Sequence, residues 1–154
     1  MFKDLFSLHG RVAVVTGGSR GIGKMIAAGF LAYGASRVYI TARKAAACEA
    51  TADELTQQHP GECIALPIDI STMAGIDALA AEIKRRENKL DILVNNAGAT
   101  WGAPIDEYPE DGWDKTVDLN TKSIFFLTQK LLPQLRAAAT HEHPARVINI
   151  ASVN

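Results

Sequence analysis

Five short runs of apolar and β-branched residues alternate along the chain with longer segments of helical pattern. The predicted strands cover residues 12–16, 37–41, 63–68, 90–94 and 146–150. The predicted helices between them cover residues 22–33, 45–58, a stretch from a cap at Ser71 or Thr72 to about 88, and 113 to about 139. Strict alternation predicts a parallel sheet, because each right-handed crossover packs its helix back on the sheet. The strands are apolar throughout, as is typical of a sheet covered on both faces. We expect one α/β domain over residues 1–154 with a doubly wound parallel sheet.

Glycine and proline mark the expected ends of the helices. Gly34 follows the first helix, where a left-handed residue commonly ends a helix. The sequence His59-Pro60-Gly61 stops the second helix. Pro133 lies inside the last predicted helix, and a proline there either kinks the helix or ends its regular part.

Composition excludes several classes of function. The formal net charge of −1 offers no basic field to nucleic acid or to an anionic membrane. No apolar run reaches the roughly 18 residues of a transmembrane helix, and the first residues do not resemble a secretory signal. Cys48 and Cys63 belong to no CxxC pair, so we predict no metal site and a reducing, cytoplasmic location.

The first predicted strand runs directly into a glycine-rich turn with the sequence TGGSRGIG. Gly17, Gly21 and Gly23 follow the spacing G-x-x-x-G-x-G at the start of the first helix. Such a turn lets the backbone approach a diphosphate closely, and the helix dipole favours the anion. The alternative is a glycine-rich turn without a ligand, but the strand–turn–helix context favours nucleotide binding in a Rossmann-type sheet.

The end of the second strand indicates which nucleotide is bound. Sheets that bind NAD usually carry an acidic residue about 20 residues after the glycines, on the ribose 2′-hydroxyl. Here the sequence is Ile40-Thr41-Ala42-Arg43-Lys44, without a carboxylate. Arg43 and Arg20 carry planar guanidinium groups suited to a 2′-phosphate, which favours NADP over NAD. The alternative is that Arg43 and Lys44 are only a solvated start of the next helix.

Motifs along the whole chain resemble the short-chain dehydrogenase/reductase family. They are TGGSRGIG, Asp69 after the third strand, the sequence NNAG after the fourth strand, Asn120 in the long helix and Ser152 after the fifth strand. Their order and spacing are similar to those of the family.

The resemblance implies a role for each of these positions. The residues expected to surround NADP(H) are Gly17, Ser19, Arg20, Gly21, Ile22, Gly23, Arg43, Asp69, Ile70, Asn96, Ala97 and Gly98. Within this set, Asp69 and Ile70 are expected to frame the adenine. Asn120 is expected to hold a water of the proton relay, and Ser152 is expected to bind the oxygen of a small carbonyl or alcohol substrate. The alternatives are that Asp69 is a helix cap, that Asn95-Asn96 is a turn, and that Asn120 is an interior polar residue that bends its helix.

A narrower resemblance concerns longer stretches of sequence. The stretches FSLHGRVAVVTGGSRGIG, LDILVNNAGATWGAPIDEYP, LLPQLR and PARVINIASVN are similar to NADPH-dependent β-ketoacyl reductases, and among them to the branch associated with rhamnolipid synthesis. The step Trp101-Gly102 carries most of this similarity. Gluconate-type and other sugar or alcohol reductases share much of the same pattern. The family further implies a homo-oligomer.

The family's catalytic Tyr-x-x-x-Lys is not found in the chain. Tyr33, Tyr39 and Tyr108 all precede Ser152, and none is followed four residues later by lysine. In the family this tyrosine donates a proton to the carbonyl oxygen, and the lysine adjusts its acidity. We therefore expect residues 1–154 to be the N-terminal part of a longer reductase, incomplete after the fifth strand and inactive alone. The fifth strand should then form a bare apolar edge. A non-catalytic nucleotide-binding or interaction protein is the alternative.

Overall fold

The computed structural model describes residues 5–152. Its strands are β1 (Val12–Thr16), β2 (Arg37–Thr41), β3 (Glu62–Leu66), β4 (Ile92–Asn95) and β5 (Arg146–Asn149). Its helices are α2 (Gly21–Ala32), α3 (Ala45–Gln58), α4 (Met73–Arg86), the 3-10 turn η1 (Ile105–Glu107), α5 (Glu110–Val117), the π-helical segment η2 (Asp118–Lys122) and α6 (Ser123–Ala138). No helix among these described residues is both long and apolar enough to cross a membrane.

The five strands form one sheet in the order β3-β2-β1-β4-β5, and every neighbouring pair is parallel. The predicted doubly wound parallel sheet is therefore confirmed. From β1 the chain winds outward to β2 and β3, and it then returns to place β4 on the other side of β1. The loops after β1 and β4 consequently separate, and ligands of open α/β sheets bind in the crevice at such a point.

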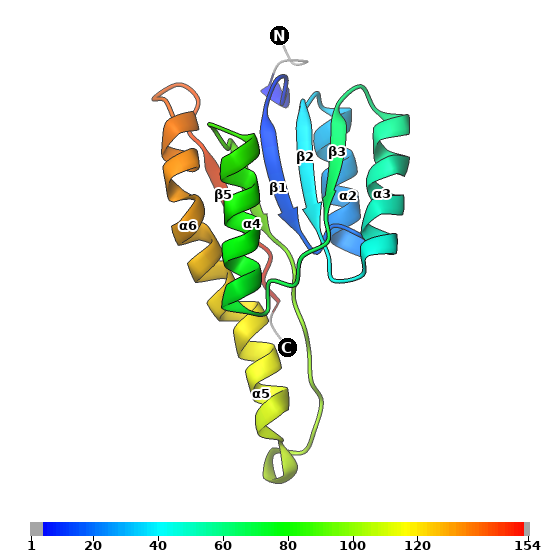
Figure 1. Ribbon diagram of the computed structural model, residues 1–154, viewed down its shortest axis with the longest axis vertical. Helices are drawn as coiled ribbons and strands as arrows, with labels where there is room; N and C mark the ends of the chain where they lie inside the picture. The colour runs from blue at the N-terminus through cyan, green and yellow to red at the C-terminus, as the bar shows by residue number, and fades with distance from the viewer. Residues whose placement is uncertain (1–4, 153–154) are drawn as a thin grey trace.

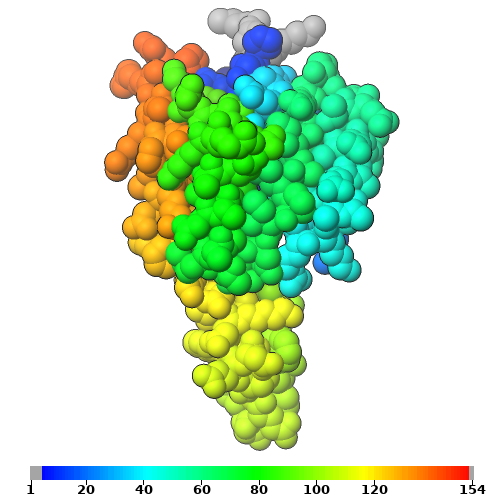
Figure 2. All heavy atoms as spheres, viewed as in Figure 1, coloured from blue at the N-terminus to red at the C-terminus, as the bar shows by residue number. Residues whose placement is uncertain are grey.

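Helices cover both faces of the sheet, with α4 and α6 in front of it and α2 and α3 behind it in Figure 1. Alternate residues of β1 enter the two cores. Val12 and Val14 pack in the core that includes Leu79 of α4, whereas Ala13 and Val15 pack in the core on the α2 and α3 side. The two cores thus account for the apolar residues at positions 12–15 of β1. At one end of the molecule, α5 extends beyond the sheet and gives a tapered outline (Figure 2).

Strand β5 lies at an edge of the sheet, as expected. Within residues 5–152 it pairs only with β4, and all four of its residues are exposed. The side chains of Val147 and Ile148 are 43% and 40% exposed. An apolar edge with unpaired backbone groups favours association with another chain.

Three predicted strands were placed slightly wrongly. Strand β5 ends at Asn149 rather than at residue 150, and β3 begins at Glu62 rather than at residue 63. Strand β3 ends at Leu66 rather than at residue 68, because Pro67 has no N–H group to donate to β2. Strand β4 begins at Ile92 rather than at residue 90. Asp91 there accepts hydrogen bonds from Arg11 and from the backbone of Val12, and the N–H of Leu90 donates to Gln134 in α6.

The helix ends agree with their sequence signals more closely. Gly34, at φ +97°, closes α2 in a Schellman motif, in which the N–H of Ala35 donates to Phe30 and that of Gly34 donates to Leu31. Thr72, rather than Ser71, caps α4, because its hydroxyl accepts from the N–H of Gly75 at 3.1 Å.

The prediction of a long helix from residue 113 placed its start too late and did not include the irregular segment in its interior. It begins at Glu110, directly after Pro109, and runs through α5, η2 and α6 to Ala138. The π-helical segment η2 interrupts the regular α-helical pattern in the middle. Pro133 does not end the helix, since α6 continues to Ala138.

Candidate functional site

The carboxyl ends of β1, β2 and β4, together with the loops that follow them, line one cavity of about 530 Å³. All twelve residues predicted to surround the cofactor line it, namely Gly17, Ser19, Arg20, Gly21, Ile22, Gly23, Arg43, Asp69, Ile70, Asn96, Ala97 and Gly98. Five further residues complete the lining: Thr41, Ala42, Lys44, Ala47 and Leu119. The fold thus gathers the predicted positions at the switch point of the sheet, while their individual roles stay predictions.

The glycine loop after β1 needs its glycines for two physical reasons. Gly17 and Gly21 have φ values of +68° and +54°, in the left-handed region that other residues rarely adopt. At Gly23 a Cβ would lie 2.3 Å from the carbonyl oxygen of Gly17. Any side chain at position 23 would therefore push the start of α2 away from the loop.

The start of α2 is an open site for an anion. Its N-cap, Arg20, makes no side-chain cap, and its first turn has no acidic residue. Within residues 5–152, the N–H groups of Gly21, Ile22 and Gly23 have no acceptor. Three unpaired N–H groups at the positive end of a helix are suited to a phosphate group, which can accept from several of them.

Neighbouring elements hold the loop in this shape. The N–H of Gly18 donates to the carbonyl of Thr41 at 3.1 Å, at the end of β2. The hydroxyl of Thr51, in α3, donates to the carbonyl of Ser19 at 2.9 Å. The loop is therefore tied to both the sheet and the next helix before any ligand binds.

Thr16, at the end of β1, organises the loop after β4. Its hydroxyl accepts from the N–H groups of Asn96 and Ala97 at 2.9 and 3.0 Å. The amide of Asn96 donates back to the carbonyls of Thr16 and Gly17. Thr16 was not among the predicted site residues, and a hydroxyl that ends an otherwise apolar strand is the sequence signal that could have identified it.

Cationic side chains dominate the part of the cavity beyond β2. Arg20 and Arg43 make no ion pair or side-chain hydrogen bond within the described part of the chain. The cavity contains one carboxylate, that of Asp69, which accepts through Oδ1 from the N–H of Ser71 at 3.0 Å. Thr72 caps α4, so Asp69 is not the cap of that helix. The second carboxylate oxygen of Asp69 accepts no hydrogen bond from residues 5–152.

The two residues expected to take part in catalysis do not line the cavity. Asn120 lies in η2. Its side-chain oxygen accepts a hydrogen bond from the N–H of Ala99, and its side-chain nitrogen donates one to the carbonyl of Ala99, each at 2.8 Å. This fixes the segment after NNAG against the helix, a role the sequence did not predict. The water-binding role of Asn120 stays a prediction. Ser152 is exposed. It lies two residues after Ile150, whose N–H donates to the carbonyl of Asn95 and so extends the pairing of β5 with β4.

None of the three tyrosines lines the cavity. Tyr39 is buried, and its hydroxyl donates to Glu87 at 2.6 Å. Tyr33 is 60% exposed, and Tyr108 donates to the carbonyl of Trp101. Among residues 5–152, no group of three or more His, Cys, Asp or Glu side chains is placed to hold a metal ion. The lining of the cavity, with its free N–H groups and arginine side chains among residues 5–152, is suited to an anion.

Three comparisons place the chain among known proteins. The family model described as short chain dehydrogenase matches residues 11–154. The rhamnolipids biosynthesis 3-oxoacyl-[acyl-carrier-protein] reductase of Pseudomonas aeruginosa is 55% identical over 148 residues, which cover 96% of this chain and 57% of that protein. The chain thus spans just over half the length of this relative.

Solved structures agree with the sequence comparison. The NADP active-site complex of RhlG from Pseudomonas aeruginosa has a TM-score of 0.89 and 54% identity, over 96% of this chain and 56% of that one. L-Sorbose reductase from Gluconobacter frateurii, complexed with NADPH and L-sorbose, has a TM-score of 0.86 and 30% identity, over 94% of this chain and 53% of that one.

Proposed function

The chain belongs to the short-chain dehydrogenase family, and we propose that it forms the cofactor-binding region of an NADP(H)-dependent oxidoreductase. The observation that carries the proposal is the cavity at the switch point of the sheet. N–H groups of α2 and the guanidinium groups of Arg20 and Arg43 line this one space, and none of them has a partner among residues 5–152. When bound, NADPH would supply a hydride to a small carbonyl compound, or NADP would accept one from an alcohol.

The residues of the cavity fit this cofactor. Gly17, Gly21 and Gly23 leave room for a diphosphate beside the backbone, and the start of α2 offers it N–H donors. Arg43 follows β2, with no acidic residue at the end of that strand, and we assign Arg43 and Arg20 to the 2′-phosphate. The free carboxylate oxygen of Asp69 is suited to the amino group of adenine.

We propose a 3-oxoacyl thioester as the substrate class, because the relative at 55% identity is named as a reductase of such compounds. Ser152 would donate a hydrogen bond to the carbonyl oxygen and so polarise the carbonyl bond. Asn120 supports this end of the site by holding the backbone of Ala99.

The proton that must reach the carbonyl oxygen has no donor of the tyrosine type in the described cavity. We therefore expect residues 1–154 alone to bind NADPH without reducing a carbonyl. The second candidate is a protein that binds NADPH without catalysis, and the lack of a tyrosine-type donor in the described cavity favours it.

We further propose a cytoplasmic location, supported by the free buried thiols of Cys48 and Cys63. We also propose a homo-oligomer, as in the family.

The test uses the protein as its gene encodes it, with NADPH and a 3-oxoacyl thioester. We expect NADPH consumption, and we expect Ser152→Ala to lower turnover by about 10²- to 10³-fold, the usual effect of removing one donor to a developing oxyanion. NADPH binding without turnover on 3-oxoacyl, sugar or alcohol substrates would contradict the reductase and support the binding-only protein. Absence of NADPH binding would contradict both.

A further inference from the structure

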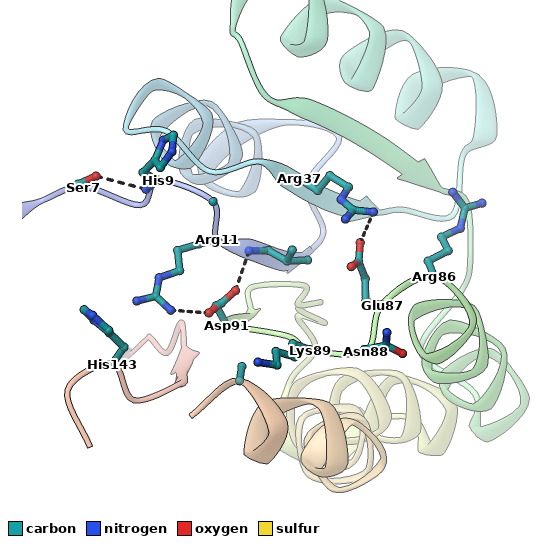
Figure 3. Close-up of a pocket in the computed structure, with 13 residues that line it drawn as sticks. Ser7, His9, Arg11, Arg37, Arg86, Glu87, Asn88, Lys89, Asp91 and His143 are labelled. Carbon is teal, nitrogen blue, oxygen red and sulfur yellow. Dashed lines mark hydrogen bonds and ion pairs between the residues drawn. The ribbon is translucent and has the colours of Figure 1, made fainter. Parts of the chain in front are cut away.

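A second cavity lies at the amino ends of the strands, opposite the end of the sheet that carries the glycine loop (Figure 3). Its volume is about 780 Å³, within the range of small-molecule sites of roughly 300–1,000 Å³. The amino ends of β1 and β2, the segment 86–91 between α4 and β4, and the loop before β5 form its walls. It shares no residue with the cofactor cavity.

The lining of this second cavity carries an excess of positive charge. Four permanent cations line it, Arg11, Arg37, Arg86 and Lys89, against the two carboxylates of Glu87 and Asp91. The whole chain has a formal net charge of −1, so this excess is local. Two histidines, at positions 9 and 143, also line the cavity.

The carboxylate of Asp91 is occupied by the protein itself. Its Oδ1 accepts from Nη1 of Arg11 at 2.6 Å, and its Oδ2 accepts from the N–H of Val12 at 2.9 Å. The side chain of Asp91 is 17% exposed and that of Arg11 is 29% exposed. Asp91 therefore holds the Arg11 guanidinium in place, while further N–H groups of Arg11 remain for a ligand.

Glu87 has the same relation to Arg37. Its Oε1 accepts a hydrogen bond from the hydroxyl of Tyr39 at 2.6 Å and forms an ion pair with Nη1 of Arg37 at 2.8 Å. The side chain of Glu87 is 7% exposed, whereas that of Arg37 is 42% exposed. The carboxylate thus lies in the wall, and the more exposed guanidinium presents its remaining donors.

Lys89 is the lining cation for which residues 5–152 provide no counter-charge. It makes no ion pair or hydrogen bond within residues 5–152. Arg86, by contrast, pairs with Glu82, which also pairs with Arg85. In Figure 3, Lys89 lies between the Arg11–Asp91 pair and the Arg37–Glu87 pair.

We propose that this second cavity binds a small polyanion that carries at least two phosphate or carboxylate groups. Arg11 and Arg37 would hold its two ends, since a guanidinium donates two parallel hydrogen bonds to either group. Lys89 would neutralise the charge between them. Two separated arginines favour such a ligand over a single inorganic phosphate.

Isothermal titration of the protein as its gene encodes it, with pyrophosphate and with citrate, tests this proposal. We expect saturable binding of at least one probe, and the probe that binds more tightly identifies phosphates or carboxylates as the anionic groups. Lys89→Glu should weaken binding by about tenfold or more, the effect of losing one charge-assisted contact. Lys84→Glu makes the same change of charge on the exposed side of α4, outside the cavity, and should weaken binding much less.

Gly23→Ala distinguishes the two ends of the sheet, because pyrophosphate also fits the glycine loop and a Cβ at position 23 would close that loop. Binding that Lys89→Glu weakens and Gly23→Ala leaves unchanged supports the second cavity. The proposal would be overturned if Gly23→Ala weakened binding and Lys89→Glu did not, if Lys84→Glu and Lys89→Glu lost binding equally, or if neither probe bound. Thermal melts of the variants establish that each is folded.

Discussion

Thr16 and Asn96 exchange hydrogen bonds across the point where β1 and β4 separate. The Thr16 hydroxyl accepts from the N–H of Asn96 at 2.9 Å, and the amide of Asn96 donates to the carbonyl of Thr16 at 2.9 Å. The two residues are 80 positions apart in the sequence. Together they fix the loop after β4 against the glycine loop, and both loops line the cavity at the switch point.

Removal of the Thr16 hydroxyl should therefore damage both stability and binding. In Thr16→Val, the N–H groups of Asn96 and Ala97 lose their acceptor, which costs about 1–3 kcal/mol for each group left unpaired in the interior. We expect a lower free energy of unfolding in urea and a weaker NADPH complex. Thr16→Ser keeps the hydroxyl and is the control. Equal behaviour of the two variants would show that the hydroxyl is not what matters.

The glycine at position 23 can be tested against another glycine of the same helix. A Cβ at Gly23 would lie 2.3 Å from the Gly17 carbonyl oxygen, whereas a Cβ at Gly29 meets nothing within 4 Å. Gly23→Ala should abolish NADPH binding, measured by fluorescence titration. Gly29→Ala should bind normally and unfold at a higher temperature, since alanine stabilises a helix interior by about 0.5–1 kcal/mol over glycine. Normal binding by Gly23→Ala would contradict the proposed diphosphate site.

Arg43 should decide between the two nicotinamide cofactors. Arg43→Ala removes a charge-assisted contact to the 2′-phosphate, worth about 1.5–3 kcal/mol, so we expect the Kd for NADPH to rise by roughly 10- to 100-fold. The Kd for NADH should change little, because NADH has no 2′-phosphate. Arg136→Ala removes an exposed arginine of α6, outside the cavity, and is the control. An equal loss for both cofactors would contradict the assignment of Arg43.

Local sequence was sufficient for the features that depend on neighbouring residues. The strand–turn–helix around Gly17, the end of α2 at Gly34 and the bounds of α3 all follow from short patterns, and the structure agrees with them. The early end of β3 also had a local signal, in Pro67, which the sequence analysis did not use. The alternation of elements gave the parallel sheet, because its geometry restricts how strands and helices can follow one another.

Features that depend on distant residues were not predictable from one sequence. The start of β4 is set by the contacts of Asp91 with Arg11 and Val12, which are about 80 positions away. Asn120 holds Ala99 from within the π-helical segment, and one extra residue in a helical turn leaves no clear mark on hydrophobic periodicity. The second cavity is also formed by residues scattered from position 7 to position 143.

The buried pair of Tyr39 and Glu87 predicts a loss of stability in alkaline solution. Burial and the hydrogen bond to the Glu87 carboxylate raise the pKa of Tyr39 well above its ordinary value. The folded state therefore keeps this proton at a pH where the unfolded chain, with a tyrosine pKa of about 10, releases it. The contribution of this proton to the stability of the folded state is complete below pH of about 10 and decreases as the pH rises further.

Tyr39→Phe should lower the free energy of unfolding by about 1–3 kcal/mol at neutral pH, since Glu87 loses a donor. The variant should also show a smaller decrease of stability in alkaline solution. Urea unfolding at several pH values measures both effects, with Tyr33→Phe, an exposed tyrosine, as the control. An unchanged alkaline decrease in Tyr39→Phe would refute the assignment to this hydroxyl.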